Sequence, residues 1–144
     1  MIRYLDRLQP FGVLVLRLVL GAIMAAHGYP KVFGGLQHNA DVVASLGIPG
    51  WLGYVSAFAE FGGGLFLVFG ILTRFAALVT LVNMLVAVGK VHWKNGFVGQ
   101  GNYQFPLALA AMALLLIFTG GGAAALDRWL FRPGGPPRSK PKTS

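Results

Sequence analysis

The chain has no cysteine among its 144 residues, and only four residues are acidic. The absence of cysteine excludes disulfide bonds, thiolate metal sites and dithiol redox chemistry. Charged residues make up 11% of the sequence and hydrophobic residues 56%. A soluble domain of this composition would expose large apolar patches and aggregate, whereas lipid solvates such a surface. The composition therefore predicts a membrane protein with a single domain.

The net charge of +8 does not indicate a nucleic-acid-binding protein. The basic residues are scattered at the ends of apolar segments, so they build no soluble basic face. Anionic lipid headgroups are the expected counter-charge. We therefore expect membrane lipids, and no nucleic acid, among the partners.

Four apolar stretches have the length of a transmembrane helix, at about residues 11–29, 51–72, 75–91 and 105–125. A helix of roughly 20 residues crosses the hydrocarbon core at 1.5 Å per residue. Only helices satisfy their own backbone in lipid, and the alternation expected of barrel strands is missing. We predict an all-α membrane protein, with a four-transmembrane-helix bundle over residues 1–131.

Lysine and arginine are unevenly distributed about these four stretches. Eight lie on one side and three on the other, namely Arg3, Arg7, Arg74, Arg128, Arg132, Arg138, Lys140 and Lys142 against Lys31, Lys90 and Lys94. The richer side is expected to be cytoplasmic, which places both termini in the cytoplasm. The loop after the first stretch then faces outward, and residues 37–46 could form a short surface helix. Residues 132–144, rich in Pro, Gly and Lys, are expected to be a disordered basic tail.

Glu60 is the only acidic residue inside an apolar stretch. A carboxyl group at membrane depth is costly unless it is neutral, paired or hydrated, so it needs a partner. Counting from the cytoplasmic edge puts Arg17 at about 9 Å, Glu60 at about 18 Å and His27 at about 24 Å. Glu60 is therefore expected to meet both Arg17 and His27 if the first two stretches are neighbours. Lys31 and His92 are further candidate partners near the outer end.

These side chains predict a polar pocket that opens outward over Glu60. The candidate catalytic residues are Glu60 and His27, and the candidate cofactor-binding residues are Arg17, His27, Lys31, Glu60, His92 and Gln104. Simpler interpretations exist: Arg17 and Glu60 could form a structural ion pair, and His27 could be a hydrogen-bonded interfacial histidine. His92 could belong to a solvated loop, and Asn83 is expected nearer the cytoplasmic side. Two histidines without a spaced motif are weak evidence for haem or copper, so we expect no metal site.

The order of these residues along the four stretches resembles the DoxX family of small bacterial membrane proteins. The resemblance depends on Arg17, His27, Gly28, Lys31, Glu60, Gly63, Gly64, Gly70, Thr73, Arg74, Met84, His92, Gly120–Gly122, Leu126 and Asp127. The chain departs from the family pattern at the start of the fourth stretch, where Gln104 replaces a frequent acidic residue. In the closing motif, Gly121 and Ala125 stand where a proline and a serine are usual.

The resemblance implies a multi-pass protein of the bacterial inner membrane, in a family whose members are sometimes associated with redox complexes. A related archaeal subunit belongs to a thiosulfate:quinone oxidoreductase. A mycobacterial relative is linked to a membrane oxidoreductase complex that handles thiol and superoxide stress. The resemblance to the family therefore predicts the architecture of the chain better than its activity.

The leading hypothesis is a quinone- or lipid-binding subunit of a membrane redox system. His27 and Lys31 would donate to the ligand, Glu60 would relay protons, and the apolar walls would be Met24, Phe58, Phe61 and Phe66. With no haem or nucleotide motif, electrons would come from a redox partner protein or a bound cofactor. The alternatives are a small transporter, which with four spans requires a homo-oligomer, and a non-catalytic scaffold for a soluble enzyme. The sequence does not decide whether the protein is an enzyme.

Overall fold

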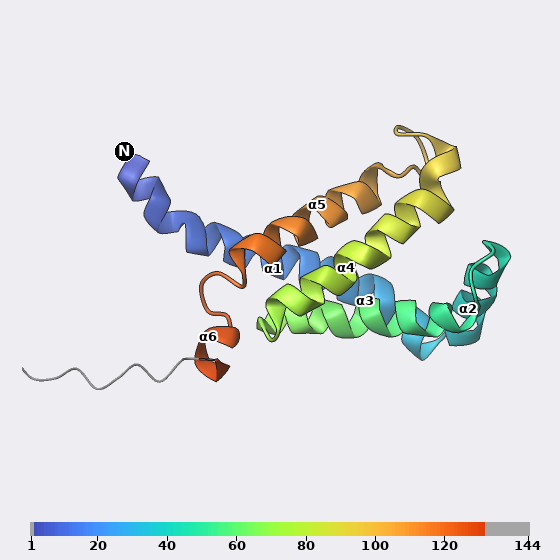
Figure 1. Cartoon of the computed structure of the whole chain (residues 1–144), viewed down its shortest axis with the longest axis horizontal. Helices are drawn as coiled ribbons and strands as arrows, with labels where there is room; N and C mark the ends of the chain where they lie inside the picture. Colours follow the sequence, from blue (N-terminus) through green and yellow to red (C-terminus); the bar gives the residue numbers. More distant parts are fainter. Residues whose placement is uncertain (1, 132–144) are drawn as a thin grey trace, which may run out of the picture.

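The computed structural model describes residues 2–131, and every regular element in that range is a helix (Figure 1). The helices are α1 (Ile2–Phe33), α2 (Leu36–Ser45), α3 (Trp51–Phe69), α4 (Thr73–Val86), α5 (Gln104–Thr119) and α6 (Asp127–Leu130). A π-helical segment, Ala87–His92, and a 3₁₀ turn, Trp93–Asn95, continue α4. The predicted basic tail at 132–144 lies outside the described residues.

Three helical segments are long and apolar enough to cross a membrane: Tyr4–Phe33, Trp51–Phe69 and Thr73–Asn95. This confirms the predicted all-helical membrane fold. The predicted fourth stretch is shorter than expected, because α5 has 16 residues and ends at Thr119. Gly120 follows with a φ of 73°, which leaves the helical path. The short helix expected between the first two stretches is present as α2.

The bundle is built from two helix pairs. α1 packs chiefly on α3, and α5 packs chiefly on α4, while the α3–α4 turn joins the pairs. Figure 1 shows the pairs close together near α6 and diverging toward the end where α2 lies. α2 packs on α3 and also touches α1. The divergence leaves space between the pairs at that end.

Small residues bring α1 and α3 into backbone contact. A Cβ atom added to Gly64 would meet the backbone N of Ala25 and would lie 2.8 Å from the Gly21 carbonyl oxygen. A Cβ atom added to Gly28 would meet the backbone N of Phe61. In lipid, helices associate through such close packing because there is no hydrophobic driving force between them.

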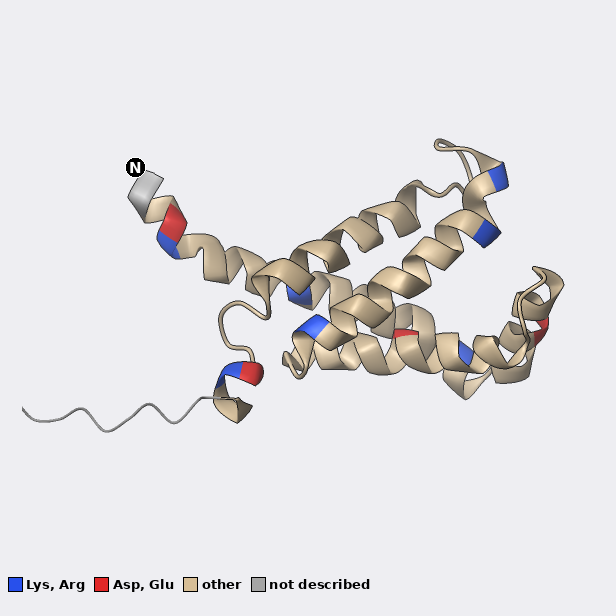
Figure 2. Cartoon of the chain, in the orientation of Figure 1, with Lys and Arg blue, Asp and Glu red and all other residues tan. Residues whose placement is uncertain are grey.

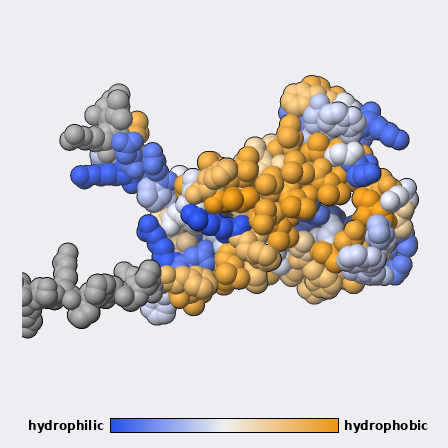
Figure 3. All heavy atoms as spheres, in the orientation of Figure 1, coloured by the Kyte–Doolittle hydropathy of each residue, from blue (hydrophilic) through white to orange (hydrophobic). Residues whose placement is uncertain are grey.

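Large apolar side chains fill the interior of the bundle from the α6 end up to the space near α2. Leu20, Leu67 and Leu116 are fully buried, and Met24 is 1% exposed. Small residues of α4 and α5, Ala77 and Ala113 among them, complete this core. Apolar residues also cover the middle of the outer surface, as Figure 3 shows for one face. Charged residues lie mostly toward the two ends of the bundle (Figure 2).

Arg17 and Asp127 hold the α6 end of the bundle together. Arg17 is 2% exposed and donates to the Gly121 carbonyl oxygen at 3.0 Å. Asp127 accepts from the backbone N–H groups of Leu72 at 2.6 Å and Thr73 at 2.8 Å, so it caps the start of α4. These contacts connect α1, the α3–α4 turn and the segment from Gly121 to Asp127.

Candidate functional site

Glu60 forms an ion pair with Lys31. The Lys31 Nζ atom lies 2.7 Å from Oε1 and 2.6 Å from Oε2 of Glu60. The Glu60 side chain is 6% exposed and that of Lys31 is 34% exposed. A buried charge is tolerated when it is paired and its remaining lone pairs are hydrogen-bonded. Lys31 therefore supplies the partner that the position of Glu60 requires.

Two polar side chains hold the same carboxylate from the α3–α4 side. Asn83 on α4 donates its Nδ2 to Glu60 Oε1 at 2.9 Å. Ser56, one turn before Glu60 on α3, donates to Asn83 Oδ1 at 2.9 Å and lies 3.4 Å from Glu60 Oε1. Residue counting placed Asn83 nearer the cytoplasmic side than Glu60, whereas in the structure the two side chains are in contact. The carboxylate is fixed from two helices besides α1.

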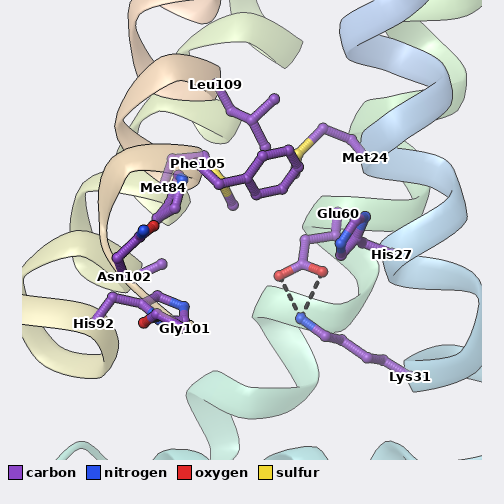
Figure 4. Close-up of a pocket in the computed structure, with 12 residues that line it drawn as sticks. Met24, His27, Lys31, Glu60, Met84, His92, Gly101, Asn102, Phe105 and Leu109 are labelled. Atoms are coloured by element: carbon purple, nitrogen blue, oxygen red, sulfur yellow. Dashed lines mark hydrogen bonds and ion pairs between the residues drawn. The ribbon is translucent and has the colours of Figure 1, made fainter. Parts of the chain in front are cut away.

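A cavity of about 370 Å³ lies over this carboxylate, between the two helix pairs (Figure 4). Its lining residues come from all four long helices and the loop before α5, and they are Met24, His27, Lys31, Glu60, Met84, Ala87, His92, Gly101, Asn102, Phe105, Pro106 and Leu109. In Figure 4, His27, Lys31 and Glu60 stand on one wall, and His92 and Asn102 on the opposite wall. Met24, Phe105 and Leu109 lie beyond these polar groups. The cavity therefore combines two polar walls with an apolar end.

The π-helical segment explains how His92 reaches the cavity. Ala87 and His92 both line it, although residues five apart in an α-helix lie about 140° apart. The i→i+5 bonding of a π-helix brings such residues close to one face. The local departure from α-helix therefore brings His92 to the same wall as Ala87.

Both histidines have a defined proton on Nδ1. His27 Nδ1 lies 3.0 Å from the Ile23 carbonyl oxygen, and His92 Nδ1 lies 2.7 Å from the Gly101 carbonyl oxygen. A carbonyl oxygen only accepts, so each Nδ1 must donate. Nε2 is then an acceptor in the neutral ring and a donor in the imidazolium. Among the hydrogen bonds of residues 2–131, none occupies either Nε2 atom.

The structure corrects the expected contact between Arg17 and Glu60. Arg17 is bonded to the Gly121 carbonyl and lies beside Gly70, and it does not line the cavity. The residue count placed Arg17 too close to Glu60, because Arg17 lies beside Gly70, which is ten residues, about 15 Å, further along the chain of α3 than Glu60. Gln104, the exposed first residue of α5, is also absent from the lining.

The structure brings together four of the six predicted site residues, His27, Lys31, Glu60 and His92. Of the expected apolar walls, Met24 lines the cavity and the three phenylalanines do not. Phe58 is 55% exposed and Phe66 is 42% exposed, and Phe61 packs against Tyr29 and Phe33. Sequence reasoning missed Ser56. Ser56 lies one turn from Glu60 along the helix, a spacing that could have identified it.

Comparison with known proteins places the chain in a family. The DoxX family model matches residues 12–93. A Bacillus subtilis protein named "Putative oxidoreductase CatD" is 32% identical over 84% of this chain and 88% of its own length. The Escherichia coli inner membrane protein YqjF is 34% identical over 88% of this chain and 97% of its own.

A second E. coli relative, the inner membrane protein YphA, is 28% identical over 88% of this chain and 97% of its own length. No solved structure matches the chain. The names of the E. coli relatives and the three membrane-length helices confirm the predicted location in the bacterial inner membrane. The family match and these relatives confirm the predicted resemblance, and the chain belongs to the DoxX family.

Proposed function

We propose that this DoxX protein binds the ring of a quinone or quinol in the cavity over Glu60, as a subunit of an inner-membrane redox system. The observation that supports this most directly is the pair of facing polar walls around an apolar space. Small-molecule sites occupy about 300–1,000 Å³, with apolar linings and few polar groups. A cavity of about 370 Å³ suits one substituted ring.

The polar groups match the oxygens of such a ring. Lys31 on one wall is a cationic donor for a quinone carbonyl, and Asn102 offers an amide on the other. The Nε2 atoms of His27 and His92 suit both forms of the ligand, since a neutral ring accepts from a quinol hydroxyl and an imidazolium donates to a carbonyl. Oxygens on opposite sides of one ring would thus each find a partner.

Glu60 and the two histidines provide places for protons. A quinone that becomes a quinol takes up electrons and protons in equal number, and the reverse reaction releases them. We assign the electrons to a redox partner protein, and the protons to His27, His92 and Glu60. The oxidoreductase name of CatD is consistent with such a partner system.

The packed core favours binding over transport. Leu20, Leu67 and Leu116 are fully buried below the cavity, which leaves no polar route toward the α6 end through them. A carrier would need a second arrangement of this layer, because packed cores do not deform continuously. In a homo-oligomer, each chain would hold a complete site of its own, because all the lining residues come from one chain.

We also propose that α5 is a fourth span and that both termini are cytoplasmic. α5 is about 24 Å long at 1.5 Å per residue, and Leu109, Ala113 and Leu116 bury one of its faces against the bundle. The N-terminus and α6 lie toward the same end in Figure 1. The excess of basic residues at that end supports a cytoplasmic location.

The test is ligand-dependent stability of the purified full-length protein in lipid nanodiscs. A water-soluble short-chain benzoquinone, and separately its quinol, should raise the midpoint of thermal unfolding. A ligand at 100 times its Kd stabilises by about 2.7 kcal/mol. Lys31→Gln and His92→Ala should each reduce the shift.

Matched controls are available at the same end of the molecule. Lys94→Gln and His38→Ala change exposed residues outside the cavity lining and should retain the full shift. No shift with either ring form, together with no quinone in an organic extract of protein purified in mild detergent, would overturn the proposal.

A further inference from the structure

The cavity has two side walls that differ in how they are closed. On the α3–α4 side, Ser56, Asn83 and Glu60 form a continuous set of hydrogen bonds between the two helices. This side is also held by the short α3–α4 turn. A ligand cannot pass here without breaking contacts to the buried carboxylate.

The α1–α5 side has no comparable closure. In the part of the chain that the structure describes, no hydrogen bond joins α1 to α5. At the polar level of the cavity, this side is closed by a ring contact between His27 of α1 and Phe105 of α5, with centroids 5.8 Å apart and planes tilted by 34°. Such a contact adds about 0.5–1.5 kcal/mol beyond the area that it buries, and no hydrogen bond has to break for the two rings to separate.

His27 and Phe105 belong both to the cavity lining and to the outer surface. Both line the cavity, yet His27 is exposed and Phe105 is 48% exposed. One helical turn away toward the α6 end, Met24 on α1 is 1% exposed and Leu109 on α5 is 4% exposed. The wall is therefore thinnest at the ring pair, and buried apolar side chains line the cavity beside it.

The thin wall faces lipid near the outer edge of the membrane. His27 lies six residues before the end of α1, which is about 9 Å along the helix axis. Pro30, one turn after His27 on α1, and Ala108, one turn after Phe105 on α5, are exposed apolar residues beside the ring pair. Whatever passes between His27 and Phe105 thus enters hydrocarbon and must be apolar.

Resting on the proposed function, we infer that the ligand is a ring with a long apolar tail, of the isoprenoid quinone class, whose tail leaves the cavity between His27 and Phe105 into the bilayer. The ring occupies the cavity and the tail stays in lipid. A cavity of about 370 Å³ takes a substituted ring and the first few carbon atoms of a tail, so the rest of a long tail has no room inside. The ligand then arrives from the membrane and not from water.

The absence of cysteine gives a direct test, because Ala108→Cys introduces the sole thiol of the chain at an exposed residue one turn after Phe105 and outside the cavity lining. Full-length A108C in nanodiscs is compared before and after labelling with a bulky aromatic maleimide, which covers the gap between α1 and α5 from the lipid side. Affinity is measured for two quinones with the same ring, one with an isoprenoid tail and one with a methyl group in its place. Labelling should weaken binding of the tailed quinone by about tenfold or more.

The short quinone should bind labelled and unlabelled protein within about twofold, since it can enter from the outer end of the cavity. Phe118→Cys is the matched control, because Phe118 lies at the other end of α5 and is 73% exposed. Labelling at Phe118 should change neither affinity. Equal losses for both quinones on labelling at position 108, or no loss for either, would overturn the tail route.

A second measurement does not depend on any variant. A tailed quinone with a photoreactive diazirine in its tail is bound to the native protein, illuminated and mapped by mass spectrometry. Adducts are expected on α1 and α5 around His27 and Phe105, and adducts confined to α3 and α4 would overturn the inference. If neither quinone binds native protein, the proposed function itself fails, which is a distinguishable result.

Discussion

At the scale of single residues, the site depends on how Glu60 is satisfied. One carboxylate is held by an ammonium from α1 and by an amide and a hydroxyl from the α3–α4 pair. The sequence identified Lys31 as one of four candidate partners for Glu60. It did not identify the amide of Asn83, because the estimate of depth misplaced that residue.

Removal of Lys31 should expose how much the pair contributes. Lys31→Met leaves Glu60 buried without its cation and should lower the free energy of unfolding by about 1–3 kcal/mol, below the 3–5 kcal/mol of fully buried pairs. The reduction reflects the partial exposure of Lys31, at 34%. Adding Glu60→Gln to Lys31→Met should restore part of the loss, as measured by thermal unfolding in mild detergent. Strict additivity of the two changes would contradict a coupled pair.

At the scale of helices, the α1–α3 contact depends on glycine at specific positions. Gly64→Ala would place a methyl group against the backbone of Ala25 and 2.8 Å from the Gly21 oxygen. We expect a loss of about 1–3 kcal/mol in the free energy of unfolding from this overpacking. Gly62→Ala on the same helix is the control, because its Cβ would meet nothing within 4 Å. Equal stabilities of these two variants would show that α1 and α3 do not pack as described.

The π-helical segment leads to a prediction about the position of His92. Deleting Gly89, which is exposed and has nothing within 4 Å of an added Cβ, removes the extra residue of this turn. The segment should return to α-helix with Ala87 and His92 only four residues apart, about 40° around the axis, so His92 should stay on the cavity side. Quinone-dependent stabilisation should then be retained, in contrast to His92→Ala, and far-UV circular dichroism should keep its helical signal. A loss of stabilisation as large as that of His92→Ala would mean that the extra residue of the π-helix does not account for the position of His92.

At the scale of the whole molecule, the number of spans is directly measurable in this cysteine-free chain. Single cysteines at Tyr4, Asn95 and Arg128 report on the N-terminus, the α4–α5 connection and α6. In intact cells, a membrane-impermeant maleimide should label position 95 only. Positions 4 and 128 should react after permeabilisation. Labelling of 128 together with 95 would mean that α5 does not cross the membrane.

The sequence by itself determined the membrane class, the helical fold and the residue around which the site is built. The length of the apolar stretches and the presence of a single acidic residue within them suffice for these, since lipid permits few spanning structures and few buried charges. Glu60 stood out because nothing else in the apolar stretches is acidic.

Only the tertiary structure decided which partners meet. Arg17 and Lys31 lie on nearly the same face of α1, about 21 Å apart along its axis, and the register of α1 against α3 sets Lys31 beside Glu60 and Arg17 beside Gly70. Likewise, the π-helical turn brings His92 to the cavity, and the end of α5 at Thr119 shortens the predicted fourth stretch. The register of one helix against another and local changes of helical pitch come from packing against neighbours, which a count of residues along one helix does not contain.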